Sequence, residues 1–473
     1  MVEGPMLLVI FVVALTVLLV SIVKFKANPF LALLGTAIFT GFLVGFPAGE
    51  IGDLVATGFG NVMRGIGIVV GLGIILGRLL AQAHATDRIA MSTLNAVGEK
   101  RSPLAIALSG YAVSIPVFQD AAFVILMPLA RKLSRITKYS FLTFVTALGV
   151  STVTTHSMVI PTPGPVAVAG NMEVDFGVFL GYGLLVSLPA VLLGAVAYAM
   201  TMKDVEPTLT VEAEMEMQEE AELERQEAAE LERGRSGATA TTTTGDSPST
   251  GPTAMRSFGV LVLPIALILT GSVMAFLLEE GTGLYQAFAF IGDKNMALFI
   301  GVLVGFWALR EFVKGGLTDV IVHSAAAAGM IFLITGAGGA LGLVITESGI
   351  GSYLVDTMTG LAITPVVLAF MLSQMLRVGQ GSTTVALITT SAILGPVAAE
   401  MGSSPVLVGL AACAGGIGLS MPNDSGFWVV SRFSGISVQN TFRTWTAGGT
   451  IAGFTALAMV LLLSLFADVL PGL

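Results

Sequence analysis

The stretch Ser151-Thr-Val-Thr-Thr-His-Ser-Met-Val-Ile-Pro-Thr-Pro-Gly-Pro165 decides how this chain is built. Three prolines and a glycine stand in its last five residues, where an α-helix cannot continue. Apolar sequence flanks the stretch on both sides. If those flanks cross a membrane, the freed backbone groups are tolerated only where they line a cavity. The stretch therefore predicts a helix that breaks at membrane depth and a site at the break.

Composition places the chain in a membrane. Apolar side chains make up 54% of it and charged side chains only 11%, whereas soluble domains carry about 25% charged residues. Several apolar segments are each roughly long enough to cross about 30 Å of hydrocarbon: Met6–Val23, Pro29–Phe46, Phe176–Met200, Ser257–Leu278, Met296–Leu309 and Thr446–Ala467. The first reads as a true span, because it is long and lacks a small-residue cleavage site. We expect an all-α polytopic membrane protein.

The acidity of the chain is confined to one segment. Residues 203–256 hold 13 acidic and 5 basic residues, which leaves 18 acidic and 17 basic residues for the rest of the chain. The segment has a Glu-rich part without an apolar stripe, followed by a run of Ala, Thr, Gly, Ser and Pro. We predict a solvated, partly disordered linker at 203–256 between a first transmembrane repeat (1–202) and a second (257–473).

The two halves share motifs at a constant spacing. Val117-Phe-Gln119 aligns with Val378-Gly-Gln380, and Pro161–Pro165 aligns with Pro422–Gly426, both at an offset of 261 residues. Each half also has a pair of apolar segments too short to cross easily, which predicts a re-entrant hairpin: Leu104–Phe118 with Ala121–Leu133, and Ala362–Leu376 with Thr383–Ala399. With about five crossings per half, the repeats must have inverted topology. The glycine-rich runs after Gly71 and Gly336 are explained by close helix packing.

Basic residues give the orientation. With the N-terminus outside, they gather in the cytoplasm while the outer loops are acidic, as the positive-inside rule requires: Lys24, Lys26, Arg88, Lys100, Arg101, Arg131, Lys132, Arg135, Lys138, Arg310 and Lys314. We therefore expect a multi-pass protein of the plasma membrane with a cytoplasmic linker and both termini outside.

Polar groups of the first half stand at the hairpin tip and at the break. Polar or charged groups at membrane depth cost several kcal/mol unless paired or wetted, so each is a site candidate. Gln119 is expected to hydrogen-bond a solute, and Asp120 to carry a coupling proton, because a low-dielectric pocket disfavours the ionised carboxyl. His156 is a candidate for both roles, and Thr162 and Gly164 for binding. The alternative is that the tip merely caps two helices and that His156 only packs.

The second half offers a cation and a polar cluster. Arg377 cannot lose its proton, so it must pair or reach water, and its planar fork suits a carboxylate. Gln380, Ser382 and Thr383 would donate hydrogen bonds beside it, and the helix N-terminus after Gly381 would favour an anion. Snorkelling of Arg377 is the alternative. The second break contributes Asn423, Asp424 and Ser425, either to the solute or to hydrogen bonds between helices.

At these residues the sequence resembles the gluconate permease family of proton symporters, within the ion-transporter superfamily. The matching pieces run through nearly the whole chain outside the linker: Lys24-Phe-Lys-Ala-Asn, Ile75-Leu-Gly-Arg-Leu-Leu through Arg88-Ile-Ala, Phe123-Val-Ile-Leu-Met-Pro, Thr155-His156 with Pro163-Gly-Pro165, Leu376-Arg377 with Gly381-Ser-Thr-Thr-Val-Ala, and Asn423-Asp424-Ser-Gly-Phe-Trp428. The family often has a histidine where this chain has Thr162, and a glutamate where it has Asp120. The linker is also longer and more acidic than usual.

The resemblance implies a secondary transporter, and not an enzyme, that imports a gluconate-like sugar acid or related small carboxylate by proton symport and alternating access. A sodium-coupled carboxylate carrier and a short hydroxy-acid permease (lactate- or glycerate-like) remain alternatives. We expect no cofactor, metal site, catalytic residue or nucleic-acid partner, and a homodimer is left open. Two other classes compete: an intramembrane hydrolase pairing Ser151 or Ser157 with His156, against which no Gly-x-Ser-x-Gly motif occurs, and an anion channel.

Overall fold

The structure is a computed structural model that describes residues 2–25, 27–98, 101–209, 251–313, 315–350, 353, 364–398, 403–422 and 424–473. Within these residues every named element is a helix, and extended pairing is limited to a single bridge between Leu209 and Ile436. Most of the Glu-rich linker, including 212–233, lies outside the described residues, so its predicted disorder is not tested.

The first half consists of helices separated by short connections. They are α1 (Met6–Val23), α2 (Pro29–Val44), α3 (Ala48–Gln82), α4 (Ala85–Val97), α5 (Ser102–Val113), α6 (Gln119–Ile136), α7 (Phe141–Met158), α8 (Pro163–Asn171), α9 (Phe176–Ala190), the π-helix η2 (Val191–Ala197) and α10 (Tyr198–Met200). The break in the decisive stretch falls between α7 and α8, where Pro163 begins the new helix. A backbone N–H in the first turn of a helix has no acceptor within the helix. Proline, which lacks this N–H, therefore suits the first helical position.

The second half repeats this order. Its helices are α12 (Ala254–Leu277), α13 (Gly283–Gly292), α14 (Lys294–Leu309), α15 (Gly316–Glu347), α17 (Pro365–Gln380), α18 (Thr383–Ala398), α19 (Pro405–Gly415), α20 (Ser425–Ser434), α21 (Val438–Thr441), the π-helix η3 (Phe442–Thr446) and α22 (Ala447–Ser464). In both halves a long helix (α3, α15) is followed by a helical pair, a broken helix and a last helix with a π-helical turn. This order confirms the two repeats, each with a hairpin and a broken helix.

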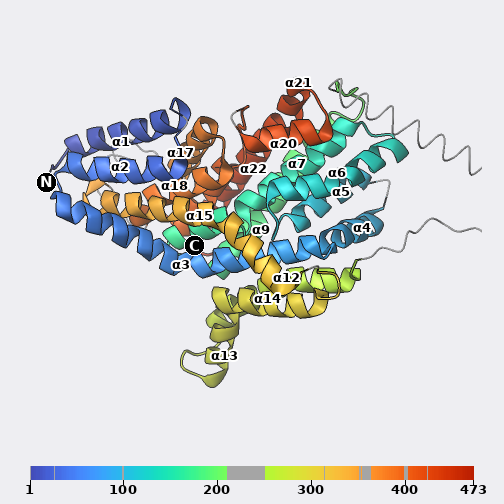
Figure 1. Ribbon diagram of the computed structural model, residues 1–473, viewed down its shortest axis with the longest axis horizontal. Helices are drawn as coiled ribbons and strands as arrows, with labels where there is room; N and C mark the ends of the chain where they lie inside the picture. The colour runs from blue at the N-terminus through green and yellow to red at the C-terminus, as the bar shows by residue number, and fades with distance from the viewer. Residues whose placement is uncertain are drawn as a thin grey trace, which may run out of the picture.

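The two hairpins enter the molecule from opposite ends. Figure 1 shows α5 and α6 toward one end of the long axis and α17 and α18 toward the other. Such opposed hairpins are what two repeats of inverted topology produce. The fold class predicted from the sequence, an all-α polytopic protein with inverted repeats, is therefore confirmed.

Length and composition identify the helices that can cross a membrane. In the described residues five helices are long and apolar enough, or up to seven if each of two bent pairs counts as one span. The five are Phe141–Asn171, Phe176–Met200, Ala254–Ala275, Ala328–Glu347 and Val438–Ser464. One bent pair is α13 and α14, which meet at 65°. The expected total of about ten crossings stays a prediction.

The glycine-rich faces of α3 and α15 let backbones touch. A Cβ on Gly77 would lie 1.9 Å from the carbonyl oxygen of Pro116, and a Cβ on Gly342 would lie 2.5 Å from that of Ala392. Each long helix therefore lies directly against the hairpin of its own half, and only glycine fits there. Close helix packing, the explanation given above for both glycine runs, is confirmed.

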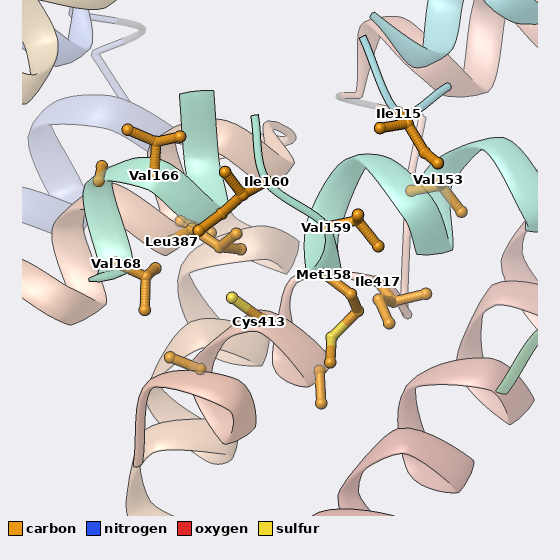
Figure 2. Packing of buried hydrophobic residues seen from close by; sticks show 14 of the residues in the cluster. Ile115, Val153, Met158, Val159, Ile160, Val166, Val168, Leu387, Cys413 and Ile417 are labelled. Carbon is orange, nitrogen blue, oxygen red and sulfur yellow. The ribbon is translucent and has the colours of Figure 1, made fainter. Parts of the chain in front are cut away.

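The first break is enclosed by side chains of the second half. Figure 2 shows Val159 and Ile160 of the break near Leu387 of α18 and Cys413 of α19. All four side chains are buried to 1% exposure or less. The halves thus interlock around the breaks, where an isolated half would leave non-helical backbone beside lipid.

Some predicted boundaries were wrong. We expected the second arm of the first hairpin to begin after Asp120, but α6 begins at Gln119, so both polar residues lie in its first turn. A carboxylate in the first turn is favoured by the positive end of the helix dipole, which explains why Asp120 lies inside the helix and not before it. The linker was predicted to extend to residue 256, but Ala254 already begins α12, with Thr253 as its N-cap.

Candidate functional site

The tip of the first hairpin is compact and buried. The connection between α5 and α6 holds Ile115 and Val117, at 8% and 5% exposure, and Gln119 is also 8% exposed. The Gln119 side chain interacts with the neighbouring Asp120 carboxyl, while its own Oε1 atom has no hydrogen-bond partner among the described residues. The tip therefore presents an amide acceptor and a carboxyl group to the interior.

The first break is closed by a hydroxyl group. The Thr162 Oγ1 atom lies 2.6 Å from the Val159 carbonyl oxygen and 2.9 Å from that of His156, so it can donate to either. These carbonyls belong to the end of α7, where helical partners run out. Thr162 thus stabilises the break, and its predicted contact with a solute is not tested.

His156 lies where the two halves meet. Its ring is 3% exposed, and Nε2 is 3.2 Å from the Thr384 hydroxyl at the start of α18. The ring centroid lies 5.5 Å from that of Phe118 at the first hairpin tip, and Nδ1 has no partner among the described residues. Gly164 is close by, since a Cβ there would lie 3.0 Å from Leu387 of α18. The first break and the second hairpin are therefore in direct contact.

Arg377 forms a buried ion pair. Its Nη2 atom is 2.6 Å from Oδ2 of Asp424, and the two side chains are 0% and 2% exposed. Snorkelling is therefore wrong for Arg377, because the side chain reaches no surface. The Nε and Nη1 atoms have no partner among the described residues. Half of the guanidinium fork is thus occupied by Asp424, and the other half remains available to a ligand.

Asp424 is held on both of its oxygens. Oδ1 accepts a hydrogen bond of 2.9 Å from the backbone N–H of Gly426, which makes Asp424 the N-cap of α20. Oδ2 also accepts from the Ser420 hydroxyl. Ser420 in turn accepts a bond of 2.7 Å from the indole N–H of Trp445 in η3. These bonds and the Arg377 pair satisfy a carboxylate that would be costly to bury alone.

Only some of the other predicted site residues of the second half lie within the part of the chain that the structure describes. Ser382 precedes α18 and its hydroxyl accepts a 3.4 Å hydrogen bond from the Val385 N–H. Thr383 is 3% exposed, and its Oγ1 atom has no partner among the described residues. Asn423 and the side chains of Gln380 and Ser425 lie outside the described part of the chain. Their binding roles stay predictions.

Both hairpin tips and both breaks contribute to one polar cluster. A Cβ on Gly426 would lie 3.2 Å from Nε2 of Gln119, so the first tip reaches the second break. Asp120 interacts electrostatically with Asp424 and Arg377, and His156 interacts with Arg377. The interlocking repeats therefore gather an amide, two carboxyl groups, an imidazole and a guanidinium. We call Gln119, Asp120, His156, Arg377 and Asp424 the midplane cluster.

Three residues of the site were missed by the sequence reading. Thr384 stood inside the quoted motif that begins at Gly381, and Ser420 stands two residues before Pro422, but neither carried a signal of its own. Trp445 lies in the π-helix η3, just before the last helix, and only its hydrogen bond to Ser420 shows that it belongs to the site. The hydrolase alternative also fails on geometry: the Ser157 hydroxyl donates to the Cys413 carbonyl at 2.6 Å, and that of Ser151 to the Leu148 carbonyl at 2.9 Å.

Comparison with known proteins agrees with this architecture. Residues 6–466 match the family described as GntP family permease. The chain belongs to this family. It is 34% identical to the inner membrane permease YgbN of Escherichia coli K12, over 95% of this chain and 96% of that protein. It is 29% identical to a gluconate permease of Bacillus subtilis, over 97% of this chain and 99% of that protein.

Two further comparisons bear on the type of protein. The chain is 28% identical to the Gnt-II system L-idonate transporter of E. coli K12, over 96% of this chain and 98% of that protein. The fold matches the YdaH transporter of Alcanivorax borkumensis with a TM-score of 0.57 at 15% identity, over 89% of this chain and 90% of that one. Because the chain belongs to a family of permeases and has apolar helices long enough to span a membrane, it is a multi-pass membrane transporter and not an enzyme.

Proposed function

We propose that this permease imports a sugar acid of the gluconate type together with a proton. The observation that carries the proposal is the half-occupied fork of Arg377. The buried guanidinium has no partner for Nε and Nη1 among the described residues, so these atoms can donate hydrogen bonds to a carboxylate. Gluconate and L-idonate are the solutes in the names of two relatives.

The rest of the cluster suits the hydroxyl groups of a sugar acid. Oε1 of Gln119, Nδ1 of His156 and Oγ1 of Thr383 are buried and unpartnered among the described residues. An amide oxygen accepts, an imidazole nitrogen accepts or donates according to its tautomer, and a threonine hydroxyl does both. Hydroxyl groups of a polyol can satisfy all three. Lactate has one hydroxyl group and glycerate two, so each would leave at least one of these three atoms unsatisfied, at a cost in affinity.

Charge balance supports proton coupling through Asp120. Arg377 and Asp424 cancel each other, so a bound carboxylate brings an uncompensated negative charge. An ionised Asp120 beside it would add a second, and like charges in a site of low dielectric repel strongly. Protonation of Asp120 removes that repulsion and leaves the remaining donors of Arg377 to the solute. Binding of the anion and of the proton would therefore favour each other.

The placement of the midplane cluster supports alternating access. The cluster lies between two interlocked repeats whose hairpins come from opposite ends, so a small movement of one repeat could open it to either side. The linker ends support a cytoplasmic linker: Ser140 N–H donates to the Lys203 carbonyl at 2.9 Å, and Arg88 Nε to that of Pro252 at 3.1 Å. Both attachment points lie beside the basic residues that predict the inner face.

Transport by purified protein in liposomes tests the coupling. In the Asp120→Asn variant, an imposed proton gradient should no longer drive accumulation of labelled gluconate, while exchange of internal for external gluconate survives. Asp53→Asn, the same change at an exposed carboxyl on α3, is the matched control and should keep both activities. Accumulation by Asp120→Asn under a proton gradient would overturn the role of Asp120. Accumulation driven by sodium instead would replace the proton in the proposal.

Competition tests the substrate class. Unlabelled gluconate, L-idonate, lactate and glycerate are each added to the exchange assay at equal concentration. Six-carbon sugar acids should inhibit exchange at concentrations at least tenfold lower than the short acids, since each hydroxyl group left out strands a buried polar atom. Stronger inhibition by lactate or glycerate would identify a short hydroxy-acid permease instead.

A further inference from the structure

Helix α3 carries a cation halfway along its length. Arg64 is the seventeenth residue of this 35-residue helix, so it lies about 24 Å along the helix from the first residue and about 27 Å from the last. Thr57, Asn61 and Arg64 are exposed and follow one another at spacings of four and three, which places them on one face. A charged side chain at membrane depth faces water or protein and not lipid. This face of α3 should therefore border an aqueous space.

The space is a cavity between the two repeats. It has a volume of about 810 Å³, which is in the range of sites for small molecules. The first half contributes α3, α8 and α9 to its walls, and the second half contributes α14, α15, α18 and α19. No residue of the midplane cluster lines it. Its polar and charged lining residues are Asn61, Arg64, Asn171, Glu173, Lys294 and Thr346.

Two helices measure the distance from this cavity to the midplane cluster. On α18, Thr384 contacts His156, and Ala392 lines the cavity eight residues later, about 12 Å further along the helix. On α3, a Cβ on Gly73 would lie 3.0 Å from a carbonyl oxygen of the first break, and Arg64 precedes Gly73 by nine residues, or about 14 Å. Both helices therefore place the cavity 12 to 14 Å, on the order of three helical turns, from the cluster.

The packing of α8 on α18 separates the cavity from the cluster. At the cluster end, a Cβ on Gly164 would lie 3.0 Å from Leu387. At the cavity end, Nδ2 of Asn171 donates to the Ser391 hydroxyl at 2.9 Å, and a Cβ on Gly395 would lie 2.2 Å from the Asn171 carbonyl oxygen. The two helices thus lie in contact from one site to the other. A solute in the cavity would wait there until these helices move.

Arg64 is the cation of the cavity without a partner among the described residues. It takes part in none of the ion pairs or hydrogen bonds formed by that part of the chain. Lys294, by contrast, lies 4.0 Å from the centroid of the Phe176 ring and interacts with acidic residues beside it. Glu173 is exposed on the connection between α8 and α9 and forms no ion pair with Arg64. The guanidinium of Arg64 is therefore left to a ligand, and a carboxylate matches its donors.

We propose that this cavity is an outer vestibule, in which Arg64 binds the carboxylate of the solute before the solute moves on to Arg377. Arg64 cannot lose its proton, and walls of low dielectric concentrate its attraction for an anion. Exposed acids of the outer loops oppose this attraction less, since salt screens their charges over about 8 Å. Glu173 and Lys294 lie in connections that the charge pattern places outside. The proposal rests on the proposed function, because it takes the transported solute to be a carboxylate.

The test measures the apparent KM for gluconate on each side of the membrane. Exchange of labelled gluconate is followed in right-side-out vesicles, which present the outer face, and in inside-out vesicles, which present the inner face. In Arg64→Gln the outer KM should rise about tenfold, through loss of one charge-assisted hydrogen bond, while the inner KM and the maximal rate stay within about twofold. Arg64→Lys keeps the charge and should keep most of the outer affinity. Arg310→Gln, the same change at the exposed arginine that follows α14, is the matched control and should alter neither KM.

Salt provides an independent measurement. Raising the salt concentration from about 0.01 M to about 0.1 M shortens the Debye length from about 30 Å to about 10 Å. The outer KM of the wild type should therefore rise more than its inner KM. In Arg64→Gln this difference between the two faces should disappear.

Several results would overturn the vestibule. An unchanged outer KM in Arg64→Gln would do so, and so would an equal rise on both sides, which would place Arg64 in a site shared by the two faces. A loss in Arg64→Lys as large as that in Arg64→Gln would mean that the charge is not used. If Arg64→Gln does not fold, the wild type decides, because an outer KM that responds to salt no more than the inner KM contradicts the proposal.

Failure of the proposed function would look different. A wild type that exchanges lactate or glycerate in place of gluconate would refute the sugar-acid substrate. The comparison of the two faces is then made with that acid, because Arg64 binds only the carboxylate. Arg377→Lys should weaken binding from both sides, which distinguishes the central site from the vestibule.

Discussion

Asp424→Asn should make the protein less stable and, at the same time, a tighter binder of the anion. Asparagine keeps the shape of the side chain and can still accept from the Gly426 N–H, but the counter-charge of Arg377 is lost. Arg377 is 0% exposed, so water cannot replace that charge. Removing one partner of a buried ion pair costs about 3–5 kcal/mol, and we expect a loss of that size in the free energy of unfolding.

The bound anion should restore part of this loss. In the wild type, a carboxylate meets a guanidinium already paired with Asp424 through a 2.6 Å contact. In the variant the bound carboxylate would take over from Asp424 as the close negative partner of Arg377, so its dissociation constant should fall. A ligand at 100 times its dissociation constant contributes about 2.7 kcal/mol, and the same gluconate concentration should contribute more in the variant.

The assay is denaturant unfolding of purified protein in micelles, with and without gluconate. Arg377→Gln/Asp424→Asn is the matched control, because it removes both charges: it should recover most of the stability yet bind no carboxylate. The reasoning is refuted if Asp424→Asn alone is as stable as the wild type without ligand, or if it binds gluconate more weakly than the wild type does.

Three further predictions follow from the same structure. Gly77→Ala should abolish uptake and lower stability, because its Cβ would lie 1.9 Å from the Pro116 carbonyl oxygen. Gly60→Ala on the same helix is the control and should be tolerated, because its Cβ would meet nothing within 4 Å. Normal uptake by Gly77→Ala would contradict the close packing. Arg377→Lys should reduce gluconate uptake at least tenfold, since an ammonium keeps the charge but loses the fork, and near wild-type affinity would exclude the fork. Replacing residues 212–250 with a short Gly/Ser linker, which keeps Pro252 and the N-cap Thr253, should leave initial uptake within about twofold, and a complete loss in correctly inserted protein would give the linker a role in transport.

The sequence by itself determined where helices stop. Proline and glycine act locally, so Pro161–Pro165 predicted the first break, and the short apolar pairs predicted both hairpins. The matching motifs at a constant offset predicted the two repeats. The start of α6 was misplaced because the polar Gln119 and Asp120 were read as turn residues, although an acid in a first helical turn is a known stabilising pattern.

Only the tertiary structure decided which polar groups meet. Arg377 and Asp424 are 47 residues apart, and His156 and Thr384 are 228 apart, so no local pattern could pair them. The sequence established that Arg377 needs a partner, because a cation inside the membrane must be paired or reach water. It did not say whether that partner is a substrate, water or an acidic side chain. The interlocking of the halves brings the second break to the end of α17, and there Asp424 takes half of the fork. The packing of one repeat against the other therefore decides which donor atoms of Arg377 remain for a solute.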